Sequence, residues 1–141
     1  RLQRVPSRAG LRCFNDSKST TPESCLLAVR AFDEAGECGS SRVHLIAGGY
    51  DKGSDLAPIG RLAASLGGLY TIGKTGPAIA RAAEGRAEEC GTLDRAVEAA
   101  LGRAKEGDVI LLSPACASWD QFENYEQRGD RFAVLVRGGA A

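Results

Sequence analysis

The chain has 141 residues, a length that suits one domain with a hydrophobic core of its own. Its 18 basic and 18 acidic residues balance to a formal net charge of zero and form no block of like charge, which argues against nucleic acid or an anionic membrane as a partner. No apolar run approaches the roughly 20 residues of a membrane span, and the polar segment 1–10 is unlike a signal peptide. We therefore expect one soluble domain.

Cysteine and histidine usage argues against disulfides and metal. The five cysteines are odd in number and lack C-x-x-C spacing, as expected of reduced thiols in a cytoplasm. The single histidine, His44, lies in an apolar run without a visible partner, so we expect it to pack within a strand rather than to bind metal. The chain contains no methionine and begins with Arg1, which indicates a domain of a longer protein.

The first half of the chain predicts a hairpin, a helix and a buried strand. Segments 2–5 and 11–14 flank a turn region with Pro6 and Gly10, which is typical of a hairpin at a sheet edge. Thr21-Pro22 is a helix start, and apolar residues recur on one face until Gly36. The apolar run 43–47 is typical of a buried parallel strand.

The second half alternates helices and strands. Asp55 is expected to cap a helix that continues to Leu66 and ends at Gly67-Gly68, and strand 69–72 and helix 75–83 follow. A short strand near Glu89, a helix 93–101 capped by Thr92 and a strand 109–112 come next. The pattern Ser118-x-x-Gln121 is a capping box for the last helix. This alternation predicts an α/β domain with a mainly parallel sheet of about six strands and helices on both faces.

Polar segments follow three of these strands. Residues 15–20, 48–55 and 113–118 each lie between an apolar run and a helical pattern. In a parallel sheet such turns lie together outside the carboxyl ends of the strands, where backbone N–H groups and helix amino termini bind anions. The sequence therefore predicts a site for phosphate or carboxylate groups.

Two lysines add positive charge to these turns. Lys52 lies between two glycines just before a helix start, and Lys18 occupies the first turn beside Asp16, Ser17 and Thr20. Solvated turn lysines, with Thr20 or Thr21 as a plain helix cap, are the alternative for either turn alone. In the third turn, Ser118 is a cap whose hydroxyl could also bind a carboxylate.

The motifs resemble the carboxy-terminal domain of the Mur ligase family. The resemblance is carried by residues 14–20, by the Gly-Gly-x-Asp-Lys-Gly-x-Asp turn, and by residues 113–122 followed by 125–129. It extends over nearly the whole chain, 1–141, and the last motif is similar to that of the D-glutamate-adding members. The resemblance implies a Rossmann-like, three-layer domain.

The resemblance further implies a monomeric, cytoplasmic, three-domain ligase of peptidoglycan synthesis. Its other domains would bind the uridine nucleotide and, through a P-loop, ATP with Mg²⁺. ATP would phosphorylate the carboxylate of UDP-N-acetylmuramoyl-L-alanine, and the amine of D-glutamate would attack the acyl phosphate. By position, the residues implied to contact D-glutamate are Thr20, Lys52, Ser118, Trp119 and Tyr125. Those implied to meet ATP are Arg1, Asp16, Ser17 and Lys18, with Lys18 as the catalytic residue.

The chain also departs from the family pattern. Trp119 stands where leucine is usual, and Tyr125 where phenylalanine is expected. The chain has no P-loop and no set of Mg²⁺-binding carboxylates, so we expect the domain alone to be inactive. Two alternatives are a stand-alone module that binds an amino acid or nucleotide, and a related ligase such as a folylpolyglutamate synthetase. The diaminopimelate-adding relatives are disfavoured, because their Asn-Pro-Arg signature is absent.

Overall fold

The computed structural model describes residues 2–8, 10–35, 39–50 and 52–138. Its strands are β1 (Gln3–Val5), β2 (Arg12–Asn15), β3 (Val43–Gly48), β4 (Gly68–Ile72), β5 (Glu88–Gly91) and β6 (Val109–Leu112). Its α-helices are α1 (Pro22–Ala35), α2 (Ala57–Arg61), α3 (Gly76–Ala82), α4 (Leu93–Arg103) and α5 (Tyr125–Val136). Short 3₁₀ turns, η1 (Ser40–Arg42) and η2 (Leu62–Ala64), precede β3 and follow α2.

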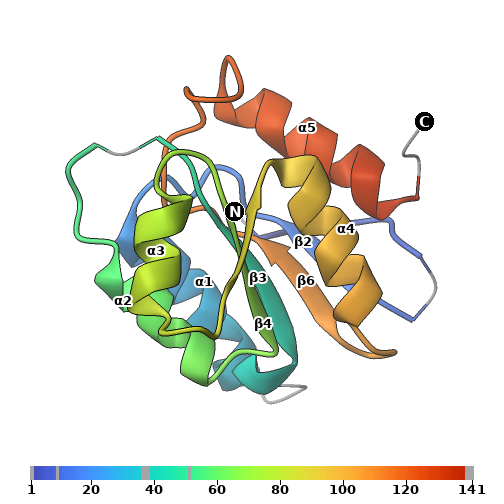
Figure 1. Cartoon of the computed structure of the whole chain (residues 1–141). Coiled ribbons are helices and arrows are strands. Elements are labelled where there is room, and N and C mark those ends of the chain that lie inside the picture. The colour runs from blue at the N-terminus through green and yellow to red at the C-terminus, as the bar shows by residue number, and fades with distance from the viewer. Residues whose placement is uncertain (1, 9, 36–38, 51, 139–141) are drawn as a thin grey trace.

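The described strands form one twisted sheet in the order β1-β2-β6-β3-β4-β5 (Figure 1). β1 is antiparallel to β2, and the other neighbours pair in parallel. The predicted edge hairpin and the mainly parallel sheet are both confirmed. β6, the last strand along the chain, lies in the middle of the sheet between β2 and β3. All six residues of β3 and all four of β6 are buried, which explains why their sequences are continuous apolar runs.

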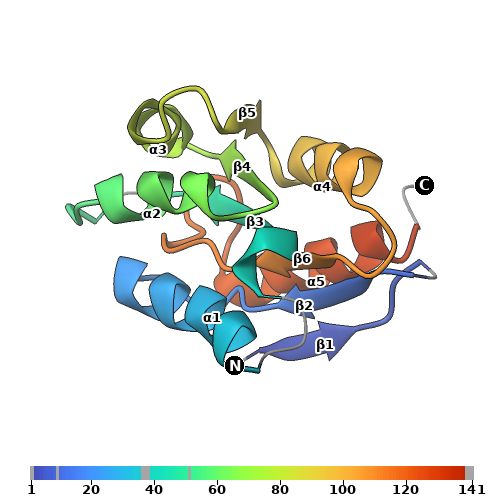
Figure 2. The same ribbon diagram turned by 90° about the horizontal axis from the view of Figure 1, so that it is seen from below.

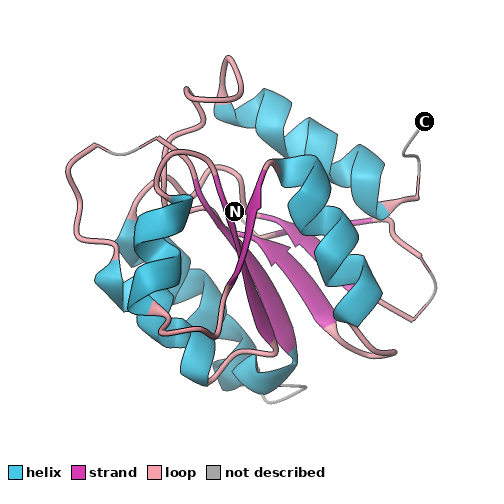
Figure 3. Ribbon diagram, viewed as in Figure 1, coloured by secondary structure: helices cyan, strands magenta, loops and turns pink. Residues whose placement is uncertain are grey.

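Helices cover both faces of the sheet (Figure 3). Seen from below, α1, α2 and α3 lie along one side and α4 and α5 along the other (Figure 2). Each face has its own core. Alternating residues of a strand enter opposite cores, as Leu45 and Ile46 do in β3. The predicted three-layer arrangement is therefore confirmed.

Helix starts follow the predicted caps in part. Thr92 caps α4 as predicted, because its hydroxyl accepts from Arg95 N. Thr21, rather than Thr20, is the capping threonine at α1, where its Oγ1 accepts from Ser24 N at 3.2 Å. The helix predicted to run from Asp55 to Leu66 is shorter: α2 spans five residues and continues only as the 3₁₀ turn η2. Gly68 does not end a helix but begins β4.

The predicted start of the last helix is wrong. Ser118 does not cap α5; Asn124 does, and its side chain accepts from Gln127 N at 2.7 Å. Residues 118–122 instead form a turn in which Ser118 O accepts from Phe122 N. Side chains of this segment bind backbone groups near β4 and β5: Asp120 Oδ2 accepts from Lys74 N, and Gln121 Nε2 donates to Gly91 O. These contacts hold the segment across the strand ends and prevent an earlier helix.

Within the part of the chain that the structure describes, no helix is both long and apolar enough to cross a membrane.

Candidate anion-binding site

The three polar turns predicted from the sequence meet at the carboxyl ends of β2, β3 and β6. Hydrogen bonds join each turn to another. Gly48 N and Tyr50 N donate to Pro114 O and Ala117 O, which ties the second turn to the third. The first turn joins the third through Ala115 N, which donates to Ser19 O at 3.1 Å. The predicted gathering of these turns is confirmed.

The first turn is held by Asp16. Its backbone N donates to Leu112 O at 2.8 Å, and its buried carboxylate accepts from Ser113 Oγ at 2.8 Å. Lys18, two residues further on, is exposed and lines a pocket with Asp16, Ser19 and the first half of α1. The two residues that the family resemblance relates to ATP thus lie in one turn, with the lysine free to reach outward and the aspartate fixed.

The second turn depends on two glycines. Gly48 and Gly49 both have a positive φ, 124° and 153°, which side chains rarely adopt. A Cβ at Gly49 would lie 2.5 Å from Ala117 O, so the close approach of the second and third turns also requires glycine there. Thr75 holds the other side of this turn, because its Oγ1 accepts from Gly49 N at 3.0 Å and its N donates to Gly49 O at 3.1 Å.

Lys52 lies in the second turn and contacts an aromatic pair. Its Nζ is 5.7 Å from the centroid of the Trp119 ring, within cation–π range. Tyr50 lies against the same indole, with ring centroids 5.6 Å apart. Trp119 is 62% exposed, so the pair forms an apolar rim open to solvent. Among the described residues no carboxylate is paired with this ammonium, which leaves it open to a ligand.

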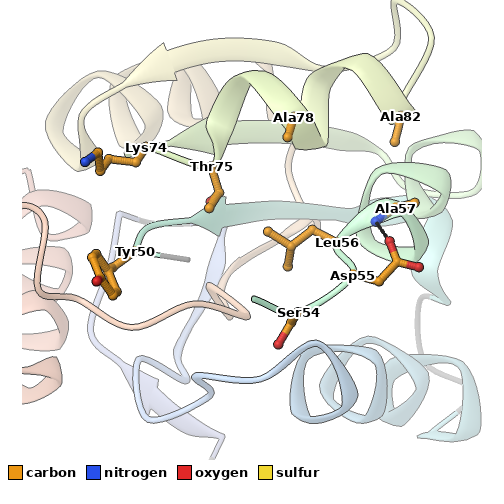
Figure 4. Close-up of a pocket in the computed structure, with 9 residues that line it drawn as sticks. All are labelled: Tyr50, Ser54, Asp55, Leu56, Ala57, Lys74, Thr75, Ala78 and Ala82. Carbon is orange, nitrogen blue, oxygen red and sulfur yellow. Dashed lines mark hydrogen bonds between the residues drawn. The ribbon is translucent and has the colours of Figure 1, made fainter. Parts of the chain in front are cut away.

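Two pockets adjoin Lys52 and Tyr50. The smaller is a cleft of about 10 Å³, room for no more than one water, and it is lined by Thr20 and Lys52 together with Tyr50, Ser54, Leu56, Ala115 and Cys116. The larger lies between the second turn, α2 and α3, with Tyr50 and Lys74 at one end and Asp55 at the other (Figure 4). Asp55 is engaged there, since its Oδ1 accepts from Ala57 N at 3.0 Å. The smaller pocket brings together two residues that the family resemblance assigns to D-glutamate.

The remaining candidate residues lie around this centre. Ser118 is buried at the end of the third turn, where its backbone O accepts from Gln121 N and Phe122 N. Tyr125 is the first residue of α5 and half-buried; its carbonyl accepts from Ser17 Oγ at 2.7 Å. Ser17 is thus a buried structural link between two segments. Arg1 lies outside the described residues.

Arg128 is the residue of this region that sequence reasoning missed. It projects from α5, is 1% exposed, and donates from Nε to Ser17 Oγ at 2.8 Å. Its terminal nitrogens donate to Ser17 O at 2.7 Å and to Cys116 O at 3.0 Å. Burial lowers the pKa of Arg128 to about 10. A charged residue in a helical pattern is normally expected at the protein surface. Only the place of Arg128 within the 125–129 motif could have indicated that it lies in the site.

His44 packs within β3, as predicted, at the opposite end of the sheet, and the structure adds polar partners that the sequence did not reveal. Its Nε2 is 3.0 Å from Asp108 Oδ2 and its Nδ1 is 2.8 Å from the Tyr70 hydroxyl. Burial would raise the pKa of Asp108, but hydrogen bonds from Lys105 N, His44 and Arg42 outweigh it and lower that pKa. Because the ionised carboxylate can only accept, Nε2 carries a proton and donates it to Asp108. This network is structural and remote from the three turns.

Comparison with known proteins identifies the family. Residues 1–116 match the sequence profile of the Mur ligase glutamate ligase domain. The chain belongs to the Mur ligase family. Over 96% of its length it is 45% identical to the UDP-N-acetylmuramoylalanine–D-glutamate ligase of Myxococcus xanthus, and over 100% it is 44% identical to that of Acidobacterium capsulatum. It spans only 29% and 30% of the length of these two relatives.

A solved structure supports the fold. A domain assigned to a UDP-N-acetylmuramate:L-alanyl-γ-D-glutamyl-diaminopimelate ligase of Haemophilus ducreyi superposes with a TM-score of 0.61. The match covers 96% of this chain and 99% of that one, at 15% sequence identity. At this identity the likeness concerns the fold alone, and it agrees with the three-layer α/β arrangement predicted for this Mur ligase domain.

Proposed function

We propose that this chain is the amino-acid-binding domain of an ATP-dependent ligase that adds D-glutamate to UDP-N-acetylmuramoyl-L-alanine in the cytoplasm. The names and the identities of the curated relatives support the reaction. The observation that carries the assignment to this domain is the meeting of the three turns, where Thr20 and Lys52 line one small cleft with Ala115 and Cys116 of the third turn, which ends at the buried Ser118. In this proposal the longer protein supplies the rest of the enzyme.

The second and third turns suit a dicarboxylate amino acid. Lys52 offers a full positive charge, and a charge-assisted hydrogen bond to a carboxylate is the strong kind. Thr20 lines the same pocket, and Ser118 offers a hydroxyl donor near by. Trp119 and Tyr50 add an apolar rim that would shield these contacts from solvent. In this proposal Tyr125, the first residue of α5, completes the wall.

The first turn suits the nucleotide. Lys18 is exposed beside the fixed carboxylate of Asp16, so it can reach a phosphate presented by a facing domain. In the proposed reaction the γ-phosphoryl group passes from ATP to the substrate carboxylate and ADP leaves. The amine of D-glutamate then attacks the acyl phosphate, forming the amide and releasing phosphate. Lys18 would stabilise the charge that develops on the transferred phosphoryl group.

Magnesium accompanies ATP in this proposal, but these residues do not form its site. Among the described residues no group of three or more His, Cys, Asp or Glu side chains could hold a metal ion. The buried carboxylate of Asp16 is instead engaged by Ser113. We therefore assign Mg²⁺ to the part of the ligase that holds the ATP phosphates.

The proposal is tested with the full-length protein that carries this domain. Phosphate release is measured with ATP, UDP-N-acetylmuramoyl-L-alanine and, in parallel, D-glutamate, L-glutamate, lysine or diaminopimelate. We expect turnover with D-glutamate only. Turnover that requires a different amino acid, or a folate acceptor, would refute the substrate assignment. Backbone amide shifts of Thr20, Lys52 and Ser118 in the 141-residue chain during a D-glutamate titration locate the binding contacts.

A further inference from the structure

The guanidinium of Arg128 is hydrogen-bonded to two of the three turns and lies beside the remaining one. It donates two hydrogen bonds to Ser17 in the first turn and one to Cys116 O in the third. It also lies behind the second turn, because a Cβ built on Gly49 would be 3.4 Å from its Nη1. The side chain belongs to α5, so one helix residue fixes the mutual positions of turns that follow β2, β3 and β6.

Among the described residues the positive charge of Arg128 has no paired anion. In the described chain it forms no ion pair, and its hydrogen-bond acceptors are two backbone carbonyls and a hydroxyl. Burial of an unpaired cation is costly, and such a charge is normally neutralised by a partner. The ionisable groups that act on it are Cys116 and Asp120, and Asp120 Oδ2 accepts from Lys74 N. This unfavourable burial of the Arg128 charge occurs next to the turns that carry Lys18 and Lys52.

Arg131, one turn later on α5, shows the more usual arrangement, in which an arginine is paired with a carboxylate of the same domain. It is partly exposed, and its Nε and Nη2 donate to Asp94 at 3.1 and 2.6 Å. Its charge is thus compensated within the domain. A purely structural role for Arg128 would be served by the same kind of pairing, whereas an unpaired charge raises the electrostatic potential of the site that it faces.

We propose that Arg128 is a positioning residue whose buried, unpaired charge also attracts the anionic ligand. The bound anion, on the opposite side of the turns from Arg128, then neutralises the charge of the guanidinium. This inference rests on the proposed function, because it takes the D-glutamate carboxylates to be that anion. Arg128 touches no substrate itself. It acts through Ser17, Gly49 and Cys116, and through the potential at the pocket of Thr20 and Lys52.

The test separates charge from shape in the full-length ligase. Arg128→Met keeps most of the volume and removes the charge, Arg128→Lys keeps the charge but loses the planar fork, and Arg131→Met is the matched control on the same helix. KM for D-glutamate is measured at saturating ATP and nucleotide substrate from pH 7 to pH 9, relative to wild type at each pH. Melting of each variant is followed by circular dichroism.

We expect Arg128→Met to raise KM by about tenfold, the order expected for loss of a nearby unit charge in a partly buried site. Arg128→Lys should stay within about threefold of wild type at pH 7. Its relative KM should then rise towards pH 9, because burial lowers the pKa of a lysine and removes the charge in that range. Arg131→Met should leave KM unchanged at every pH.

Equal KM values for Arg128→Met and wild type would overturn the inference while leaving the proposed ligase intact. So would a relative KM for Arg128→Lys that does not change with pH, since loss of shape alone does not titrate. If Arg128→Met fails to fold, the pH profile of Arg128→Lys decides alone. A wild-type protein without D-glutamate-dependent turnover refutes the proposed function, and the inference with it.

Discussion

Asp108→Ala is expected to destabilise the domain by about 2–6 kcal/mol. The carboxylate of Asp108 is buried and accepts from Arg42 Nε at 2.9 Å, His44 Nε2 at 3.0 Å and Lys105 N at 2.9 Å. Arg42 is half exposed and can bind water instead. The other two donors would be left unsatisfied, at a cost of about 1–3 kcal/mol each.

The same carboxylate gives the effect a definite pH dependence. The folded-state pKa of Asp108 is lowered, so its contribution to stability is complete above the unfolded-state pKa of about 3.9. That contribution is lost as pH falls through the lower, folded-state pKa. The difference in free energy of unfolding between wild type and Asp108→Ala should therefore shrink as the pH is lowered from about 5 to about 2.

Urea denaturation of the 141-residue chain measures this difference, with circular dichroism and the fluorescence of Trp119, the single tryptophan, as probes. Asp94→Ala is the matched control, because its carboxylate forms an exposed pair with Arg131 worth about 1 kcal/mol or less. A loss below about 1 kcal/mol for Asp108→Ala, or a difference that does not vary with pH, would show that the network is not held by an ionised Asp108.

Other predictions concern the site and the last helix. In the full-length ligase, Lys52→Met should raise KM for D-glutamate by roughly tenfold or more, because a charge-assisted hydrogen bond worth about 1.5–3 kcal/mol is lost. The melting temperature should hardly change. Unaltered D-glutamate kinetics would make Lys52 a solvated turn residue. Lys18→Met should lower kcat and raise KM for ATP more than KM for D-glutamate, in steady-state kinetics that vary each substrate separately; an effect on D-glutamate alone would contradict its assignment. Asn124→Ala should cost about 1 kcal/mol in urea denaturation, because it caps α5, and an unchanged midpoint would argue against that cap. The 141-residue chain alone should release no phosphate from ATP, and turnover by it would overturn the division of labour proposed here.

Element order could be predicted from the sequence because local patterns decide it. The buried strands β3 and β6 are apolar apart from His44, and Thr92 caps α4 through a bond to the backbone N three residues further on. The start of α5 shows where local patterns fail. Ser118-x-x-Gln121 and Asn124-x-x-Gln127 are both acceptable caps. The choice between them depends on contacts to Lys74 and Gly91, which are far away in the sequence.

The three polar turns of the candidate site could be predicted from the sequence, but the buried Arg128 at its centre could not. That the polar turns would meet follows from the parallel order of the strands. Arg128 was not predictable, because its partners Ser17 and Cys116 are separated from it by different distances along the chain, 111 and 12 residues. Tyr50 was missed for a similar reason: its contact with Trp119 joins two turns. An amphipathic pattern shows which face of a helix is apolar. It does not show that a cation such as Arg128 is buried beneath a loop.

The central place of β6 has a consequence for how the domain is made. Arg12 and Val109 are register partners between β2 and β6, so nearly a hundred residues separate strands that lie side by side. During synthesis β2 and β3 emerge early, each with an unpaired edge that only β6 can fill. Such long-range pairing folds slowly and exposes edges that aggregate. The third turn and α5 follow β6, so the anion site is assembled only when the ribosome has nearly finished the domain.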